Sequence, residues 1–364
     1  MRRDIKIPTG DFNKSNYTTF IIVGDVGGTN TSMAIVGVRT NTSFDIIFKH
    51  SYFTKEIRAF EHILNETLKK AKDEYNIEIE VAALGAAGPI SDNREYVKLT
   101  NADLELNTYE LLNKTLLKKI ILLNDFEAVG YGLDLLDLSE DVIKLPHSGE
   151  DLTESSTTSN YAAIGAGTGF GMCIAFYDRQ RKLHMPFPSE GGHIELAPNN
   201  RLEMGLIRFI KKKKQARRDV HPDVESVLSG PGLENIYDFL ISKTWFKNKI
   251  LRKIGLLQDA EKLAEIEANY HLDKTCRKTI DLFISFYARA ARNLALMSKC
   301  YAGLFIVGKI ALKELEFIKD KKFMQEFEQH SKRPDILERI PVYVITNESI
   351  SLYGCSNAAI NFFN

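Results

Sequence analysis

The chain has 364 residues, of which 44% are hydrophobic and 26% charged. Basic and acidic residues number 48 each, so the formal net charge is zero and we expect no nucleic-acid partner. No apolar stretch reaches membrane-spanning length and no secretory leader is recognisable, so we expect no membrane partner and predict a cytoplasmic location. The length exceeds one ordinary hydrophobic core, which predicts two lobes.

The first elements predicted are an extension and a hairpin. Residues 1–18 are polar and are expected to form a loose N-terminal extension. An apolar run at residues 21–26 then breaks into a glycine-rich turn, and a second apolar run follows at residues 33–38. The turn has no bulky side chain, so its backbone N–H groups can approach a phosphate. Asp25 would oppose a bare anion and fits better beside a metal ion that accompanies the phosphates.

Strands and helices alternate in the next segment, which predicts an α/β fold. Residues 59–75 carry apolar side chains at helical spacing, and residues 81–84 form a short apolar strand. A strand at residues 120–123 runs directly into Asn124 and Asp125. A carboxylate at a strand end in such a sheet faces the ligand crevice and can accept a proton from a hydroxyl. Capping of the following helix explains Asp125 equally well.

A second turn of the same kind lies at residues 165–171 and again joins two strands. It is not a dinucleotide fingerprint, because Phe170 stands where glycine is required and a strand follows instead of a helix. Residues 303–309 resemble a P-loop, but Ile310 replaces the required Ser/Thr and the intervening residues fit a buried strand. Two turns rich in glycine and threonine favour a nucleotide site over two plain hairpins.

Residues 189–195 place two carboxylates and a histidine around paired glycines. Their spacing does not suit zinc, whereas it suits hydrogen bonding to a polyhydroxylated ligand. A surface turn is the simpler alternative, and Glu225 taken alone would be an ordinary helix residue. The four cysteines are scattered, show no zinc spacing and are expected to be buried free thiols.

Taken together, these motifs resemble the bacterial-type glucokinases over nearly the whole chain. The resemblance rests on residues 24–30, 123–126, 165–169, 190–193, 228–233 and 341–343, in that order. It implies the two-lobed ribonuclease-H-like (actin-like ATPase) α/β fold with a central cleft. The domains expected are the extension at 1–18, a small α/β domain at 19–135 plus 348–364, and a large α/β domain at 136–347.

The resemblance also implies roles for individual residues. Asp125 resembles the catalytic base, and Asp25 is expected near Mg²⁺, directly or through a water. The glucose-binding residues implied are Asn101, Asn124, Asp125, Glu190, His193 and Glu225. The ATP-binding and phosphate-binding residues implied are Asp25, Gly27, Gly28, Thr29, Asn30, Gly167, Thr168, Gly169 and Gly308. The activity implied is transfer of the γ-phosphoryl group of ATP to the 6-hydroxyl of glucose, by a homodimer.

Two departures from the family pattern leave alternatives open. Lys309 replaces the second glycine of a Gly-Gly-Ile segment near adenosine, which leaves the choice of phosphoryl donor open. Leu104 stands where the family often has an aromatic residue on the sugar side. Two alternatives to a glucokinase therefore remain: a kinase for another hexose, and a sugar sensor without catalytic activity.

Overall fold

The structure is a computed structural model that describes residues 5–6, 11–40, 43–146, 148–149, 158–213, 221–245, 247–257 and 259–363. The chain divides into two compact units. The first comprises Met1–Asp141, Gln180–Pro188 and Asn347–Asn364, and the second comprises Val142–Arg179 and Ser189–Thr346. The sequence predicted a small domain that ends at residue 135 and resumes at residue 348. In the structure the first unit extends to Asp141, resumes at Asn347, and also contains residues 180–188, which the sequence prediction placed in the large domain.

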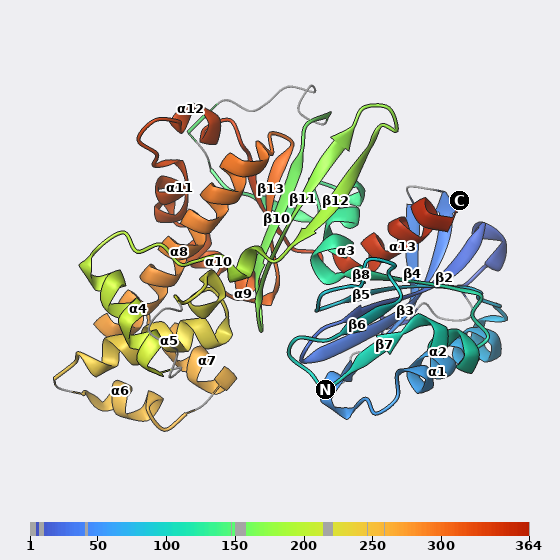
Figure 1. The fold of residues 1–364 in the computed structure, drawn as a ribbon, viewed down its shortest axis with the longest axis horizontal. Helices are drawn as coiled ribbons and strands as arrows, with labels where there is room; N and C mark the ends of the chain where they lie inside the picture. Colours follow the sequence, from blue (N-terminus) through green and yellow to red (C-terminus); the bar gives the residue numbers. More distant parts are fainter. Residues whose placement is uncertain are drawn as a thin grey trace. The chain divides into compact units, whose positions relative to one another are not determined.

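The first unit is an α/β layer structure around one large sheet, with helices on both faces (Figure 1). The strand order is β1-β4-β3-β2-β5-β8, with β2, β5 and β8 parallel to one another and β3 antiparallel to both of its neighbours, β2 and β4. Its elements are β1 (Ile5–Lys6), β2 (Thr19–Val26), β3 (Asn30–Thr40), β4 (Ser43–Phe53), α1 (Phe60–Tyr75), β5 (Val81–Ala86), β6 (Tyr96–Lys98), β7 (Glu105–Asn107), α2 (Thr108–Lys114), β8 (Lys119–Asn124), α3 (Asp125–Gly132) and α13 (Ile350–Phe363).

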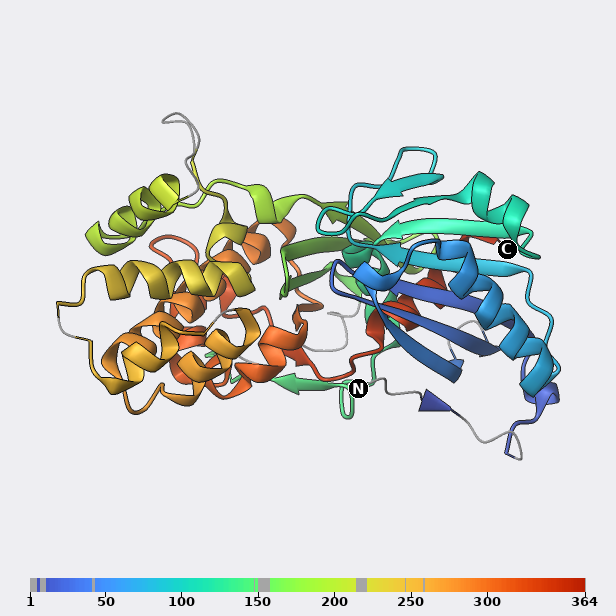
Figure 2. The ribbon, with the colours of Figure 1, turned by 90° about the horizontal axis from the view of Figure 1, so that it is seen from below.

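Alternate residues of β2 serve two separate cores, as the two faces of a strand require. Ile22 packs with α1, which lies across one face of the sheet (Figure 2). Ile21 and Val23 pack on the opposite face with Tyr131 of α3 and Leu352 of α13. The helix predicted at residues 59–75 is confirmed as α1, and its apolar stripe is the side that faces this core.

The extension before Thr19 is not loose where the structure describes it. β1 pairs with β4, and Phe12 stacks on Tyr17 with ring centroids 5.8 Å apart. The Tyr17 hydroxyl donates to Asp45 at 2.8 Å, and its ring lies against Gly37, where a Cβ atom would come within 2.5 Å. For residues 11–18 the expectation was wrong, because two aromatic residues in this polar segment pack against the first unit.

The second unit combines one sheet with a helical region. Its sheet has the strand order β12-β11-β10-β13-β14-β9, and of β12 only Ser189 is counted with this unit, because residues 180–188 are grouped with the first one. The elements are β9 (Val142–Lys144), β10 (Tyr161–Ala166), β11 (Phe170–Asp178), β12 (Leu183–Ser189), α4 (Arg201–Lys213), α5 (Gly230–Ser242), α6 (Lys249–Ile254), α7 (Asp259–Ala268), α8 (Lys274–Ser298), β13 (Gly303–Val307), α9 (Lys309–Lys313), α10 (Leu315–Ile318), α11 (Lys321–Glu328), α12 (Pro334–Leu337) and β14 (Val342–Ile345). Short 3₁₀ helices η5 (Gly191–His193) and η6 (Val224–Ser226) connect some of them.

The internal repeat predicted from the two glycine turns is visible in the topology. In each unit an antiparallel hairpin, β2–β3 or β10–β11, lies beside a strand parallel to its first member. The rejection of a P-loop at residues 303–309 is also confirmed. β13 is completely buried and packs with the long helix α8, so its apolar side chains are core residues.

Candidate active site

The first glycine turn joins β2 to β3 and is fixed by hydrogen bonds within the first unit. The Gly27 N–H donates to the Asn30 carbonyl at 3.0 Å, which closes the hairpin. The Thr54 N–H donates to the Thr29 carbonyl at 3.0 Å, and the Thr54 hydroxyl donates to the Gly27 carbonyl at 2.7 Å. The side chains of Thr29 and Asn30 are exposed. The turn is therefore a fixed loop with small polar side chains at its tip, as a phosphate site requires.

Asp25 lies one residue before the end of β2, with its side chain half-buried. Its Oδ2 accepts a hydrogen bond at 2.8 Å from the hydroxyl of Ser351, in the first turn of α13. Sequence analysis did not find Ser351, because it is 326 residues away and belongs to no recognised motif. Ser351 orients the carboxylate that we expected beside a metal ion.

Asn101 and Asn124 lie along the same edge of the first sheet as this turn. β2, β5 and β8 end together, with Val26 opposite Ala86 and Ala86 opposite Asn124. The segment before Asn101 is tied to this edge by a 3.0 Å bond from the Thr100 N–H to the Ala87 carbonyl. A Cβ atom on Gly28 would come within 2.9 Å of the Asn101 Cβ, so Asn101 packs directly on the glycine turn.

Asn124, and not Asp125, caps helix α3. The Asn124 Oδ1 accepts from the N–H groups of Phe126 at 3.0 Å and Glu127 at 3.3 Å, and the Glu127 carboxylate accepts from the Asn124 N–H at 3.4 Å. This reciprocal pair is a capping box. Asp125 is the first residue of α3, and its Oδ1 also accepts from the Phe126 N–H, at 2.9 Å. The capping explanation for Asp125 is therefore wrong.

The second glycine turn joins β10 to β11 and is fixed within the second unit. The Gly167 N–H donates to the Gly169 carbonyl at 2.8 Å, and the Gly167 carbonyl accepts from Gly230, the first residue of α5, at 3.0 Å. Gly308 adopts a φ of +103° directly before α9, and a Cβ atom there would lie 3.0 Å from the Ala166 carbonyl oxygen. A side chain at Gly308 would be strained, so a glycine at this position next to the turn has a steric reason.

The predicted sugar-binding residues of the second unit gather at the base of the same turn. The Glu225 Oε2 accepts from the Phe170 N–H at 2.7 Å. Gly192 packs so tightly on the Phe170 carbonyl that a Cβ atom would lie 2.1 Å from its oxygen, and this contact fixes η5 and His193. The His193 Nε2 lies 3.8 Å from the Glu190 carboxylate, while its Nδ1 lies 3.0 Å from the Asp223 carboxylate.

Comparison with known proteins gives a consistent result over almost the full length. The family model named Glucokinase matches residues 22–361. The glucokinase of Trichormus variabilis is 33% identical over 361 residues, covering 94% of this chain and 99% of that protein. The chain belongs to the glucokinase family. The glucokinase of Nostoc punctiforme is 32% identical over 355 residues, with the same coverage of both chains.

Solved structures agree with the glucokinase assignment. A glucokinase from an Antarctic psychrotroph superposes with a TM-score of 0.75 at 27% identity, covering 94% of this chain and 99% of that one. The glucokinase of Balamuthia mandrillaris, crystallised with glucose, gives a TM-score of 0.78 at 22% identity and 94% coverage of both chains. At that identity the second likeness concerns the fold, which is the one that the sequence motifs implied.

The glucokinase-family chain also contains functional candidates that the motifs did not reveal. Ser351 and Asp223 each hold a predicted site residue in place. The hydrogen bond to Asp223 is the main cause that raises the pKa of His193 above its ordinary value, against the opposing effect of burial. The carboxylates of Glu225 and Glu190 add to the increase.

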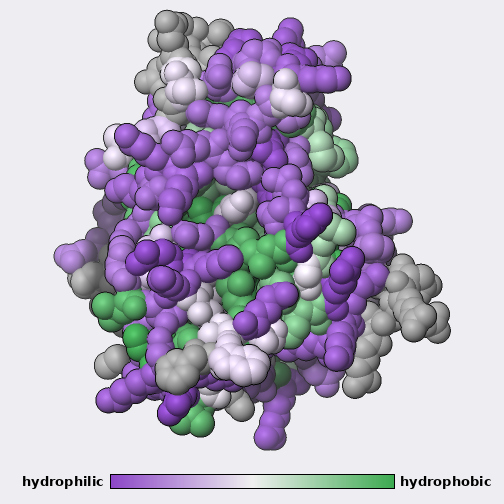
Figure 3. All heavy atoms as spheres, turned by 90° about the vertical axis from the view of Figure 1, so that its left-hand side faces the viewer, coloured by the Kyte–Doolittle hydropathy of each residue, from purple (hydrophilic) through white to green (hydrophobic). Residues whose placement is uncertain are grey.

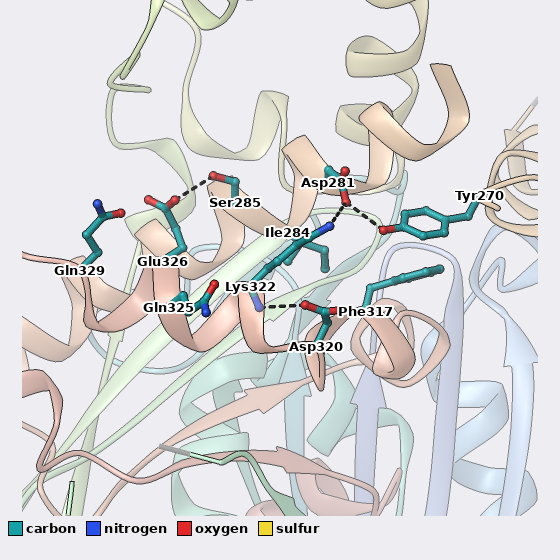
Figure 4. Close-up of a pocket in the computed structure, with 10 residues that line it drawn as sticks. All are labelled: Tyr270, Asp281, Ile284, Ser285, Phe317, Asp320, Lys322, Gln325, Glu326 and Gln329. Atoms are coloured by element: carbon teal, nitrogen blue, oxygen red, sulfur yellow. Dashed lines mark hydrogen bonds and ion pairs between the residues drawn. The ribbon is translucent and has the colours of Figure 1, made fainter. Parts of the chain in front are cut away.

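A separate hollow of about 310 Å³ lies in the second unit beside α8, α10 and α11 (Figure 4). It contains none of the predicted site residues. Asp281 accepts from the Tyr270 hydroxyl at 2.9 Å and from the Lys322 ammonium at 3.4 Å, and Glu326 accepts from Ser285. Because these charged groups are satisfied by one another, we assign no substrate to this hollow.

The surface shown in Figure 3 is mostly hydrophilic, with hydrophobic side chains gathered near its centre. Among the helices that the structure describes, none is long and apolar enough to cross a bilayer. The four cysteines are buried free thiols, as expected from their spacing.

Proposed function

We propose that this chain is an ATP-dependent glucokinase, which transfers the γ-phosphoryl group of ATP to the 6-hydroxyl of D-glucose. Membership of the glucokinase family makes it a hexose kinase. The observation that best supports a working enzyme is the position of Asp125. Asp125 follows directly after strand β8 and is the first residue of α3. The cap of that helix is Asn124.

The roles proposed for the chain's own residues follow from their positions. Asp125 accepts the proton of the 6-hydroxyl as the new P–O bond forms. Asn101, Asn124, Glu190, His193 and Glu225 bind the hydroxyl groups of glucose. Their hydrogen bonds hold the reacting oxygen in line with the donor, which removes much of the entropic cost of the reaction.

The two glycine turns bind the phosphates of ATP through backbone donors and the hydroxyls of Thr29 and Thr168. Gly308 allows the backbone to approach the adenosine. The donor set around Asp25 fits Mg²⁺, because this ion commonly takes only one or two carboxylates and completes its shell with phosphates and water. No group of three or more potential metal ligands occurs in the described part of the chain. Mg²⁺ bound with ATP neutralises phosphate charge.

Replacement of Asp125 tests the base assignment. In Asp125→Asn, kcat should fall by about 10²–10⁴-fold because the proton acceptor is lost, whereas glucose should still bind. A coupled assay for glucose 6-phosphate and calorimetric titration with glucose measure the two effects. Glu110→Gln, which removes a carboxylate on the exposed side of α2, is the control and should keep wild-type turnover. Near-normal turnover of Asp125→Asn would show that another group is the base.

A panel of sugars and donors tests the two alternatives. Glucose, mannose and fructose should be assayed with ATP, ADP and polyphosphate, because Lys309 is exposed immediately after Gly308 and bears on donor choice. We expect the highest kcat/KM with glucose and ATP. Preference for another hexose would identify a different sugar kinase, and the absence of turnover with every pair would favour a sensor.

We further propose that the protein is a homodimer, as the family resemblance implies, and that it is located in the cytoplasm. Sedimentation equilibrium should then give twice the chain mass of 41.2 kDa. A mass equal to one chain across the micromolar range would contradict the dimer and leave the catalytic proposal unaffected.

A further inference from the structure

Asp223 is not part of any recognised motif, yet it contacts the one histidine among the predicted sugar-binding residues. Its Oδ2 lies 3.0 Å from the His193 Nδ1. The backbone brings the two together, because the Val224 N–H donates to the Ile194 carbonyl and the Leu196 N–H donates to the Pro222 carbonyl, both at 3.0 Å. This short antiparallel pairing fixes the separation of η5 and η6.

The Asp223 carboxylate is itself held in one orientation. Its Oδ1 accepts from the Ser226 N–H at 3.0 Å and from the Ser226 hydroxyl, so that it caps η6. This leaves Oδ2 directed at His193. The same 3₁₀ turn carries Glu225, whose carboxylate accepts from Phe170. One short turn thus positions two of the predicted sugar ligands.

An ionised carboxylate can only accept hydrogen bonds, so the His193 Nδ1 must carry a proton in both charge states of the ring. The atom that changes is Nε2, which is a hydrogen-bond acceptor in the neutral ring and a donor in the cationic ring. His193 faces three carboxylates, those of Asp223, Glu190 and Glu225. Of these, Asp223 is the one bonded to the ring, and Glu190 is 3.8 Å from Nε2.

We propose that Asp223 is a positioning residue for sugar binding: it holds His193 in the Nδ1–H tautomer, so that Nε2 is the atom offered to a hydroxyl group of the sugar. The proposal rests on the proposed function for the identity of the ligand. It adds a residue that acts through His193 and does not touch the substrate.

The first test needs no substrate, and its one variant serves only to assign the signals. The ring nitrogens of His193 are observed by long-range ¹H–¹⁵N correlation spectra of the uniformly labelled full chain, and His193→Gln identifies the signals among the eight histidines. In its neutral form the wild-type ring should carry the proton on Nδ1, and it should titrate above the pH expected for a free histidine. A neutral ring protonated on Nε2 would overturn the proposal, whether or not the protein phosphorylates glucose.

The second test compares Asp223→Asn with Asp335→Asn. Asp335 is an exposed aspartate of the same unit that pairs with Arg333, at 3.0 Å, so its replacement is a matched loss of charge outside the predicted site. In Asp223→Asn the His193 titration should move to lower pH, both tautomers should appear, and KM for glucose should rise roughly tenfold with kcat changed less than about twofold. Asp335→Asn should change none of these.

The two tests separate the possible failures. Wild-type tautomer and KM in Asp223→Asn would overturn the positioning role. An altered tautomer in a protein that neither binds nor phosphorylates glucose would instead overturn the proposed function.

Discussion

Gly28 and Gly167 occupy similar turns but have different surroundings. A Cβ atom on Gly28 would lie 2.9 Å from the Asn101 Cβ, which is closer than carbon atoms normally approach. On Gly167 the nearest atom would be the Gly169 carbonyl oxygen at 4.0 Å. The first turn is therefore packed against a predicted sugar ligand, while the tip of the second has open space.

Alanine at these two positions should affect stability differently. We expect Gly28→Ala to lower the free energy of unfolding by about 1–3 kcal/mol, because Asn101 or the turn must move. Gly167→Ala should remain within about 0.5 kcal/mol of wild type. Urea unfolding of both variants measures the difference, and equal losses would mean that contact with Asn101 does not restrict the first turn.

At the level of elements, the junction of α9 and α10 contains a buried carboxyl group. Glu314 is 0% exposed, and neither side-chain oxygen has a hydrogen-bond partner among the described residues. Burial is the main cause that raises its pKa to about 9. The Glu267 carboxylate, close but not in hydrogen-bonding geometry, raises it further, Glu316 adds to this, and Lys313 opposes it. Glu314 is therefore protonated in the folded protein at neutral pH.

This predicts a specific pH dependence of stability. The unfolded chain releases the Glu314 proton near pH 4.5, while the folded chain retains it up to about pH 9. Its contribution to stability is thus complete below the unfolded pKa and is lost as the pH rises through the folded one, with a slope of up to about 1.4 kcal/mol per pH unit. In Glu314→Gln, the unfolding free energy should fall less steeply between pH 5 and pH 9.

Chemical denaturation at intervals across that pH range makes the comparison. Glu110→Gln is the control, since it changes an exposed glutamate of α2 that does not act on Glu314 and should keep the wild-type slope. Parallel curves for wild type and Glu314→Gln would show that Glu314 is ionised in the folded state.

Local patterns predicted the elements well, while contacts between distant residues escaped them. Helical spacing located α1, and the apolar residues after Gly303 indicated a buried strand instead of a P-loop. From the sequence, Asp125 could equally be a proton acceptor or the cap of the following helix. The structure shows that α3 begins at Asp125 and that Asn124 is its cap. Ser351 and Asp223 reach their partners only through the fold, so no local spacing reveals them.

At the level of the whole molecule, the N-terminal segment supports the first unit at a distance from its glycine turn. The Thr18 N–H donates to the Val38 carbonyl, at the end of β2 opposite to Asp25. Phe12 and Tyr17 pack beside Phe20 there, with Phe12 also in edge contact with Tyr75. The segment contributes to stability without adjoining the predicted phosphate site.

Removal of residues 1–18 should therefore weaken folding more than catalysis. We expect a loss of about 2–3 kcal/mol in unfolding free energy from two half-buried aromatic side chains, with KM for glucose unchanged. Tyr17→Phe isolates the hydroxyl bond to Asp45 and should cost about 0.5–1.5 kcal/mol. Unfolding curves and steady-state kinetics of both variants test this. A truncated protein as stable as wild type would mean that these aromatic contacts contribute nothing.

The placement of α13 has a consequence for biosynthesis. This helix supplies Leu352, Cys355 and Ala358 to the core that also contains Ile21 and Val23. A ribosome must translate the entire second unit before α13 emerges. Until then this apolar face of the first sheet is covered by α3 but lacks α13, so the first unit can complete its fold only after the second has been made. Nascent chains stalled before residue 350 should accordingly recruit hydrophobic-binding chaperones, although Asp125, the predicted catalytic base, is already synthesised.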